Sequence, residues 1–320
     1  MLNIISLILN TDMKILVTGG TGLVGMAIQS VESEFEHDMI YVNSKDCDLT
    51  DYESTFRMIK ENTPDCVVHL AACVGGLYKN MNFKVDMLEN NLLMNYNILR
   101  SCFMNSVPRF LGTLSTCIFP DRTTYPINED MLHDGPPHDS NDAYAYAKRM
   151  LDTHCRAYNE QHNTNYSCII PSNIYGEHDN FSLEDAHVLP ALIHKCYLAK
   201  KAGEDFEVRG TGKPLRQFIY SKDLARAILS LAPKLNQENV IIVGSDQEIT
   251  IDRAATAVAK SFDYGHRMCF NPQYSDGQFK KTADNSKLMK LLPDFKCTDI
   301  DTGIKNSVQF FEENYPNIRL

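Results

Sequence analysis

The chain reads Lys14-Ile15-Leu16-Val17-Thr18-Gly19-Gly20-Thr21-Gly22-Leu23-Val24-Gly25 close to its N-terminus. An apolar run typical of a strand leads into glycines spaced Gly-x-x-Gly-x-x-Gly, and a helical pattern follows. Gly19 permits a tight turn, Gly22 lets the backbone approach a pyrophosphate at the helix N-terminus, and Gly25 lets helix and strand pack closely. Between a strand and a helix, this motif predicts a dinucleotide-binding site.

Strands and helices are predicted to alternate from residue 13 to about residue 170. Short runs rich in β-branched residues predict strands at 14–18, 39–42, 66–70, 109–114 and 166–170. Longer patterns predict helices at 23–33, 51–62, 82–105 and 142–161. The strand runs are apolar almost throughout, so both faces of the sheet should be covered. This predicts a doubly wound, parallel α/β sheet of Rossmann type, whose ligands bind beyond the carboxyl ends of the strands.

The residues after the second predicted strand bear on the choice of cofactor. A cofactor without a 2′-phosphate would usually meet an acidic residue there, but the chain has Ser44 and Lys45. A hydroxyl and a cation suit a 2′-phosphate, which favours NADP over NAD. Asp48 and Leu49 are expected to face the adenine, and the small Ala71 after the third strand is expected to let the cofactor pass.

The regular alternation ends after Pro171, where a loop at 173–185, a helix at 187–200 and a glycine-rich turn at 210–212 are predicted. We expect an N-terminal extension at 1–12 and an NADP-binding Rossmann domain at 13–172. Residues 173–320 should form mainly a smaller α/β substrate-binding domain, with some segments returning to the Rossmann domain. The apolar start lacks a basic region and is too short to span a bilayer, so it is not expected to be a membrane segment.

The composition argues against several classes of partner. The chain has 31 Lys and Arg against 41 Asp and Glu, a net charge of −10, so it offers no basic surface for nucleic acid or an anionic membrane. Its 10 cysteines form no Cys-x-x-Cys pair, and the chain is long enough to fold without disulfides. We therefore expect reduced thiols and a cytoplasmic location, and no metal site.

Tyr144 and Lys148 stand at the helical spacing i, i+4, so their side chains share one face of a predicted helix. A lysine near a phenol favours the phenolate and lowers the phenol's pKa. Ser115, at the end of the fourth predicted strand, completes a Ser-Tyr-Lys set. Such a set can relay a proton during hydride transfer to or from a carbonyl.

Further segments identify a family. They are Ser-Thr-Cys-Ile-Phe-Pro at 115–120 and the stretches 171–181, 187–192 and 210–218. Together with the glycine motif they resemble the extended short-chain dehydrogenase/reductases that modify nucleotide sugars and, among these, the GDP-L-fucose synthase family. The resemblance runs from about residue 13 to the C-terminus. In the related 4,6-dehydratases an Asp-Glu pair follows Ser-Thr, and here Cys117 and Ile118 stand in its place.

The resemblance implies a reaction in two parts. GDP-4-keto-6-deoxy-D-mannose would be epimerised at C3 and C5 and then reduced at C4 by NADPH to GDP-L-fucose. It implies Cys117 as the base and His187 as the acid, with His178 as the alternative acid. Ser115 and Tyr144 would polarise the C4 oxygen.

The resemblance also completes the predicted binding sites. The cofactor set is Gly19, Gly20, Thr21, Gly22, Leu23, Val24, Gly25, Ser44, Lys45, Asp48, Leu49, Ala71, Lys148, Pro171, Ser172, Asn173, Ile174 and His187. The substrate set is Asn173, Lys195, Arg209, Arg216, Asp276 and Lys281. Arg209 stands where the family commonly has Trp, and Thr21 replaces an arginine that some bacterial relatives use on the 2′-phosphate.

Two other functions remain possible on these residues. A 4-epimerase or 4-reductase for another nucleotide sugar would use the same cofactor without needing Cys117 or His187. A non-catalytic NADP-binding sensor would typically lose the tyrosine or the lysine, and both are present here. Helices 82–105 and 142–161 resemble the pair that forms a four-helix interface in such reductases. They predict a homodimer through Leu88, Leu92 and residues 94–99.

Overall fold

The computed structural model of the chain describes residues 12–244, 248–274, 276 and 279–320. Residues 1–11 of the expected N-terminal extension lie outside the described residues. In the part that is described, no helix is both long enough and apolar enough to cross a membrane.

A parallel sheet forms the larger lobe and confirms the predicted fold class. Its strand order is β10-β5-β4-β3-β1-β2. The strands are β1 (Lys14–Thr18), β2 (Asp38–Val42), β3 (Cys66–His69), β4 (Arg109–Thr113), β5 (Asn165–Pro171) and β10 (Asn239–Ile242). In the registers of β1, Thr18 lies opposite both Val42 and His69, the last residues of β2 and β3. The loops after these three strands therefore open at one edge of the sheet, where ligands of doubly wound folds bind.

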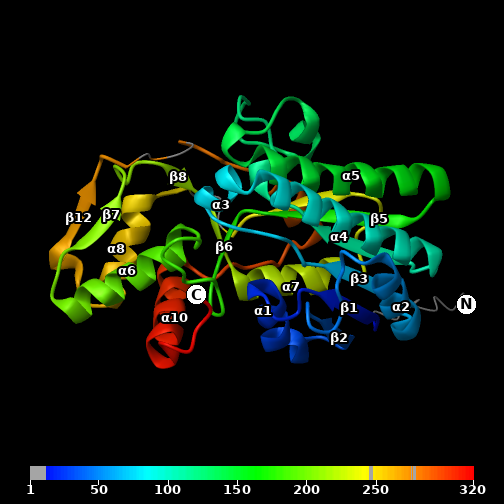
Figure 1. The fold of residues 1–320 in the computed structure, drawn as a ribbon, viewed down its shortest axis with the longest axis horizontal. Helices are drawn as coiled ribbons and strands as arrows, with labels where there is room; N and C mark the ends of the chain where they lie inside the picture. Colours follow the sequence, from blue (N-terminus) through cyan, green and yellow to red (C-terminus); the bar gives the residue numbers. More distant parts are fainter. Residues whose placement is uncertain (1–11, 245–247, 275, 277–278) are drawn as a thin grey trace, which may run out of the picture.

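Helices cover both faces of this sheet (Figure 1). One hydrophobic cluster packs the sheet against α2 (Tyr52–Asn62), α4 (Lys84–Met104) and α5 (Asp142–His162). A second cluster packs the other face against α1 (Leu23–Val31), α7 (Ser221–Leu231) and α9 (Ser286–Leu291). The predicted helix 82–105 is α4, which begins at Lys84, and the short α3 (Leu77–Asn82) precedes it.

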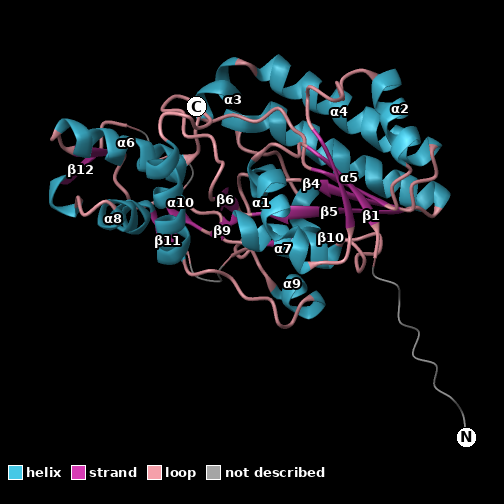
Figure 2. Cartoon of the chain, turned by 90° about the horizontal axis from the view of Figure 1, so that it is seen from below, coloured by secondary structure: helices cyan, strands magenta, loops and turns pink. Residues whose placement is uncertain are grey.

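The smaller lobe, which Figure 2 shows to one side of the large sheet, has a hydrophobic core of its own. Helices α6 (Val188–Ala202), α8 (Ile251–Ser261) and α10 (Ile300–Asn314) surround it. Three short strand pairs complete this part of the chain: β7 (Phe206–Arg209) with β12 (Met268–Asn271), β8 (Leu215–Arg216) with β11 (Ile249–Thr250), and β6 (Asn173–Tyr175) with β9 (Phe218–Tyr220). The chain crosses between the lobes more than once, because α7 and β10 pack in the larger lobe.

Candidate active site

A cavity of about 840 Å³ opens at the carboxyl ends of the strands, and the glycine loop forms one wall. Gly19 has φ +73°, and a Cβ there would lie 2.9 Å from the backbone N of Ala71. A Cβ on Gly25 would lie 2.5 Å from the carbonyl oxygens of both Gly19 and Gly20. Larger side chains cannot fit at either position. The wall is therefore backbone at the N-terminus of α1, which suits a bound pyrophosphate.

The cavity continues past the end of β2, where Asn43, Ser44, Cys47, Asp48 and Leu49 line it. Of the predicted cofactor residues, Lys45, Gly20 and Ser172 are not among those that line the cavity. Lys45 is exposed on a turn that its backbone N–H closes on Asn43 Oδ1 at 2.8 Å. Gly20 packs against Tyr41, and Ser172 is buried beside β10, donating its N–H to Ile242. The sequence predicted that these three residues contact the cofactor, but none of them is part of the cavity wall.

The predicted tyrosine and lysine both line the cavity from α5. Lys148 is buried, donates from Nζ to the Thr113 carbonyl at 2.9 Å, and lies 5.8 Å from the centroid of the Tyr144 ring. Burial lowers the pKa of Lys148 to about 8. The pKa of Tyr144 is raised by burial and by the nearby thiols of Cys117 and Cys73. The expected lowering of the tyrosine pKa is therefore wrong for this structure, because desolvation of the phenolate and the two neighbouring thiols all raise the pKa.

Ser115 and Cys117 belong to one tight turn, the 3₁₀ helix Thr116–Ile118 that follows β4. The Cys117 N–H donates to Ser115 Oγ at 3.4 Å, and Asn141 donates to the Cys117 carbonyl at 3.3 Å. Ser115 lines the cavity, whereas Cys117 is not among the lining residues. Cys117 is half-buried, and its thiol is close enough to Tyr144 and Lys148 to influence the pKa of each.

His187 lines the cavity from the residue before α6, and the two candidate acids are well separated by the fold. Burial lowers the pKa of His187, and the ammonium of Lys281 lowers it further. Burial lowers the pKa of Lys281, and the nearby Cys117 thiol acts in the opposite direction by raising it. His178 does not line the cavity, and its ring packs on Phe310 with centroids 4.5 Å apart. The structure thus brings His187, and not His178, to the cofactor cavity.

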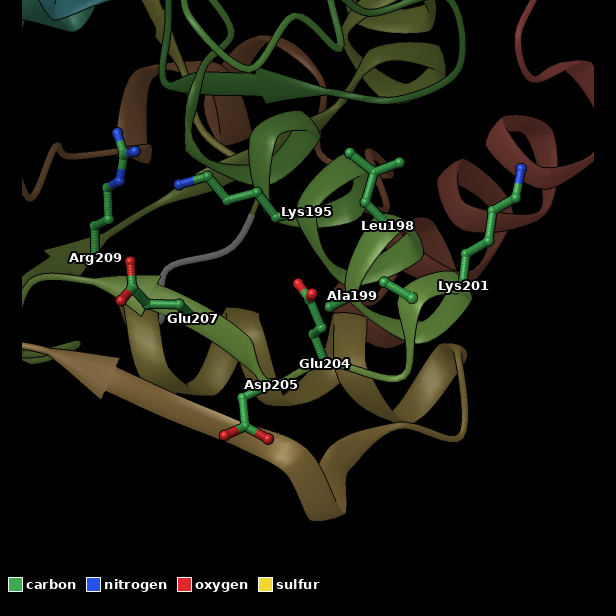
Figure 3. A pocket seen from close by; sticks show the side chains of 9 residues that line it. Lys195, Leu198, Ala199, Lys201, Glu204, Asp205, Glu207 and Arg209 are labelled. Carbon is green, nitrogen blue, oxygen red and sulfur yellow. The ribbon is translucent and has the colours of Figure 1, made fainter.

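The predicted substrate residues lie mostly on the smaller lobe. Lys195 on α6 and Arg209 on β7 line a separate groove and extend toward the same space (Figure 3). The Arg209 guanidinium lies 4.6 Å from the centroid of the Tyr274 ring, a cation–π contact. Asp276 accepts hydrogen bonds from Thr211 N and Oγ1, each at 2.7 Å.

Arg216 and Lys281 are neighbours, and Lys281 also lies near Cys117 on the turn Thr116–Ile118, called the catalytic turn below. Burial lowers the pKa of Arg216, and the same guanidinium lowers the pKa of Lys281. Asn173 lines the cofactor cavity and donates to the Gln217 carbonyl at 2.8 Å. Lys281, close to both Cys117 and Arg216, and Arg216 itself are therefore two neighbouring cations that can attract an anionic ligand.

The cavity also includes residues that the sequence did not predict. They are Asn43, Cys47, Leu70, Ala72, Val74, Gly75, Met94, Thr113, Leu114, Asp179, Asn180, Asp185 and Arg319, together with the end of β2 at Val42. Those beside strand ends could have been found by extending the predicted strands. Asp179 and Asn180 stand inside a segment that carries the family resemblance. Nothing in the sequence indicates Arg319, which is one residue from the C-terminus.

Comparison with known proteins identifies the family. Residues 15–244 match the NAD dependent epimerase/dehydratase family. A GDP-L-fucose synthase of Dictyostelium discoideum is 46% identical over 95% of this chain and 97% of its own, and a probable GDP-L-fucose synthase of Drosophila melanogaster is 44% identical over 96% and 99%. A GDP-L-fucose synthetase of Naegleria fowleri, solved with NADP bound, superposes with a TM-score of 0.90 at 45% identity, covering 96% of this chain and 94% of that one. With these matches along nearly its whole length, the chain belongs to the NAD dependent epimerase/dehydratase family and, within it, to the GDP-L-fucose synthases.

Proposed function

We propose that this chain converts GDP-4-keto-6-deoxy-D-mannose to GDP-L-fucose, by epimerisation at C3 and C5 and reduction at C4. The observation that carries the proposal is the shared cavity. Ser115, Tyr144, Lys148 and His187 line it together with the glycine loop, and Cys117 adjoins it on the same turn as Ser115. The relatives named above carry this activity in their names, which agrees with the proposal.

The cofactor that fits the cavity is NADP. Gly19 to Gly25 would hold the pyrophosphate, and Asn43 and Ser44 would lie near the 2′-phosphate, since no carboxylate directly follows β2. NADPH supplies the hydride that reduces C4. The Naegleria fowleri relative was solved with this cofactor bound.

Tyr144 acts as the proton donor in the reduction. Its raised pKa keeps the phenol protonated at neutral pH, so a proton is available for the C4 oxygen. Lys148, fixed by Thr113, lies beside the ring and stabilises the phenolate that forms when the proton leaves. Ser115 is a second donor toward the same oxygen.

Cys117 and His187 carry the epimerisation. The Cys117 thiolate removes a proton from C3 or C5 and becomes a thiol, and the electrons of that C–H bond move onto the C4 oxygen to give an enolate. Ser115 and Tyr144 stabilise this oxygen by hydrogen bonds. His187 then returns a proton to the carbon from the opposite face, which restores the ketone with inverted configuration.

The nucleotide part of the substrate lies toward the smaller lobe. Lys195 and Arg209 supply cations in the groove of Figure 3, and Arg216 and Lys281 bring positive charge toward the sugar. Asn173 contacts the sugar from the cavity side, and Asp276 closes the site through Thr211. A protein with a net charge of −10 needs such a local positive field for a diphosphate ligand.

An assay with GDP-4-keto-6-deoxymannose and either NADPH or NADH tests the function and the cofactor together. We expect oxidation of NADPH, faster than of NADH, and GDP-L-fucose identified by NMR. A reduced but unepimerised sugar would place the chain with the simple 4-reductases. Binding of NADPH without turnover would instead indicate a sensor.

We also propose a homodimer, through a face that keeps Tyr96 of the predicted residues 94–99 and leaves out Ile98 and Leu99. Ile98 and Leu99 are fully buried inside the chain and cannot reach a partner. The exposed apolar residues of α4 and α5 include Leu93, Tyr96, Tyr146 and Met150. Helices α4 and α5 contact each other, and two such pairs would cover these residues in a four-helix interface.

The remaining expectations stay proposals. We propose that residues 13–172 form the cofactor-binding domain and that 173–320 form mainly the substrate-binding domain, apart from α7 and β10. No cysteine forms a disulfide, which supports a reducing, cytoplasmic location. We expect neither nucleic acid nor a membrane as a partner.

A further inference from the structure

The C-terminal segment after α10 is anchored in the smaller lobe and reaches the cofactor cavity. Tyr315 and Ile318 pack against the core of that lobe, and the Arg319 carbonyl accepts a hydrogen bond from Phe181 N at 2.9 Å. The C-terminus lies at the junction of the two lobes in both Figure 1 and Figure 2. This attachment brings Arg319 into the cavity wall.

Arg319 is the cation best placed for a ligand among the described residues of this wall. The others are Lys148, which is buried and donates to Thr113, and His187, whose pKa is lowered. Arg319 has no hydrogen-bond or ion-pair partner for its side chain in the described part of the chain. The wall also holds the carboxyl groups of Asp48, Asp179 and Asp185, so a phosphate-rich ligand would otherwise face mainly acidic side chains.

Asp179 provides a second, independent sign of a ligand at this place. Its side chain is 5% exposed, Oδ1 accepts from Asn180 N at 2.7 Å, and Oδ2 has no hydrogen-bond partner. Burial raises the pKa of this carboxyl to about 7, while Arg319 acts in the opposite direction. A carboxyl group left without a partner in a ligand cavity is rare unless something binds beside it.

The position of the loop that carries Asp179 indicates which phosphate of the dinucleotide Arg319 can reach, the diphosphate bridge or the 2′-phosphate. At its far end, the carbonyl oxygen of Asp185 lies 3.1 Å from where a Cβ on Gly76 would be, so the loop meets the segment after β3. Ser44, expected near the 2′-phosphate, follows β2, beyond β1 at the edge of the sheet. The segment after β3 adjoins the glycine loop, because a Cβ on Gly19 would lie 2.9 Å from Ala71 N. Arg319, bonded to the loop that meets this segment, therefore lies on the β3 side of the glycine loop, and Ser44 follows β2 on its other side.

We infer that Arg319 binds the diphosphate bridge of the dinucleotide cofactor and that Asp179 positions its guanidinium. An arginine fork matches two phosphate oxygens, and such charge-assisted bonds are stronger than neutral ones. The glycine loop would hold the diphosphate by backbone N–H groups on one side, and Arg319 would supply the opposing charge on the other. This inference rests on the proposed function, because it takes the cavity to be an NADP site.

Titration calorimetry on the full-length chain tests it with NADPH, NADH and GDP as probes. Arg319→Gln keeps the backbone bond to Phe181 and removes the charge. We expect the Kd values of NADPH and NADH to rise by the same factor, roughly tenfold or more, with the Kd of GDP unchanged. Arg319→Lys should recover part of the affinity. Arg57→Gln, an exposed residue of α2 outside the cavity, is the charge-matched control and should leave every Kd unchanged.

Asp179→Ala separates a positioning role from a structural one. In the chain with Arg319 it should weaken NADPH binding severalfold, and in the Arg319→Gln background it should cause no further loss. Equal losses in both backgrounds would overturn the positioning role. Melting temperatures of all variants identify any that fail to fold.

Several results would overturn the role of Arg319. Unchanged binding of both dinucleotides would mean that Arg319 binds no phosphate of the cofactor. A loss confined to NADPH would assign it to the 2′-phosphate, and a loss confined to GDP would assign it to the substrate. Failure of the unmodified chain to bind NADPH or to turn over would instead refute the proposed function itself. The two failures are therefore distinguishable.

Discussion

Lys148 and Tyr144 lose their hydration inside the protein, and burial favours the neutral form of each side chain. The pKa of Lys148 is lowered to about 8 and that of Tyr144 is raised, although the two side chains are neighbours. A neutral phenol can give a proton, and a lysine still largely protonated at neutral pH can stabilise the phenolate that remains. The pair is therefore ready for reduction, which needs a proton donor, before any ligand binds.

Replacing Cys117 tests the assignment of the base. Cys117→Ala should lower epimerisation by roughly a hundredfold or more, because the group that removes the C3 and C5 protons is lost. Some reduction at C4 should remain, since Tyr144 and Lys148 are untouched. The measurement is solvent deuterium incorporation at C3 and C5, followed by NMR of the product.

The control for this experiment is Cys269→Ala, an exposed thiol on β12. It should incorporate deuterium as the unmodified chain does. If Cys117→Ala still gave GDP-L-fucose at an undiminished rate, another group would have to be the base.

His69 should make the protein less stable in acid. It is fully buried, its ring nitrogens pair with Thr18 and Asn95, and burial lowers its pKa from the ordinary 6.5 to about 3. Between these values the unfolded chain binds a proton that the folded chain does not. The free energy of unfolding therefore falls as the pH drops below about 6.5, and His69 contributes about 1 kcal/mol of this loss per pH unit.

Denaturant unfolding at pH 7.5, 6.5 and 5.5 measures this effect. His69→Gln should be less stable at pH 7.5, because one of its hydrogen bonds is lost, but its stability should fall less steeply with acid. His266→Gln, at an exposed position, should keep the slope of the unmodified chain. Identical slopes in all three proteins would remove His69 as the cause.

Among the elements, α5 has two functions on two faces. Its inner face presents Tyr144 and Lys148 to the cavity, and its outer face exposes Tyr146 and Met150. The residue after the lysine, Arg149, holds the catalytic turn. Its Nε donates to the Ile118 carbonyl at 2.6 Å and its Nη1 donates to the Gly135 carbonyl at 2.7 Å. A buried guanidinium thus fixes the turn that carries Ser115 and Cys117 relative to the helix.

Arg149→Met should misplace that turn. The substitution leaves two carbonyl groups without a donor, which we expect to cost about 2 kcal/mol of stability and to lower kcat by roughly tenfold or more. The Kd of NADPH should change little, because Arg149 is not among the residues lining the cavity. Thermal unfolding, steady-state kinetics and NADPH titration measure the three quantities.

A matched control is Arg156→Met on the same helix. Arg156 is half-exposed and pairs with Asp152 at 3.0 Å, so its loss leaves the catalytic turn intact. It should retain kcat. A proportional loss of kcat in both variants would mean that the effect comes from the helix as a whole.

At the scale of the whole molecule, the reaction needs both lobes. The larger lobe supplies the glycine loop and Tyr144, while His187 comes from the residue before α6 in the smaller lobe. The second core anchors α10 and the C-terminal segment, which brings Arg319 to the same cavity. In the proposed mechanism, the acid His187 and the base Cys117 therefore approach the sugar from different parts of the chain, as inversion at a carbon centre requires.

The quaternary structure is tested by placing a charge on the exposed face of α4 and α5. Met150→Lys should give the mass of one chain by light scattering, where the unmodified protein gives the mass of two, because a buried unpaired charge opposes association. Met289→Lys, on an exposed position of α9, should remain dimeric. A single-chain mass for the unmodified protein at working concentration would exclude the dimer.

The predicted strands and most helices match the structure within a few residues. The pattern was readable because a parallel strand buried on both faces is apolar throughout, and a glycine motif signals a local backbone geometry. The same reasoning placed Tyr144 and Lys148 on one face of a helix. It wrongly included Ile98 and Leu99 in the interface face of α4, because both side chains are buried within the chain.

The sequence by itself determined the α/β fold, the glycine loop and the Ser-Tyr-Lys set, because each depends on residues close together in the chain. Only the tertiary structure decided which groups meet and with what charge. Lys45 does not line the cavity, while Arg319 reaches it from the other end of the chain, and the pKa of Tyr144 is raised where a neighbouring lysine alone would lower it. The physical reason is that burial and long-range contact depend on how the lobes pack, and neither is encoded in local spacing.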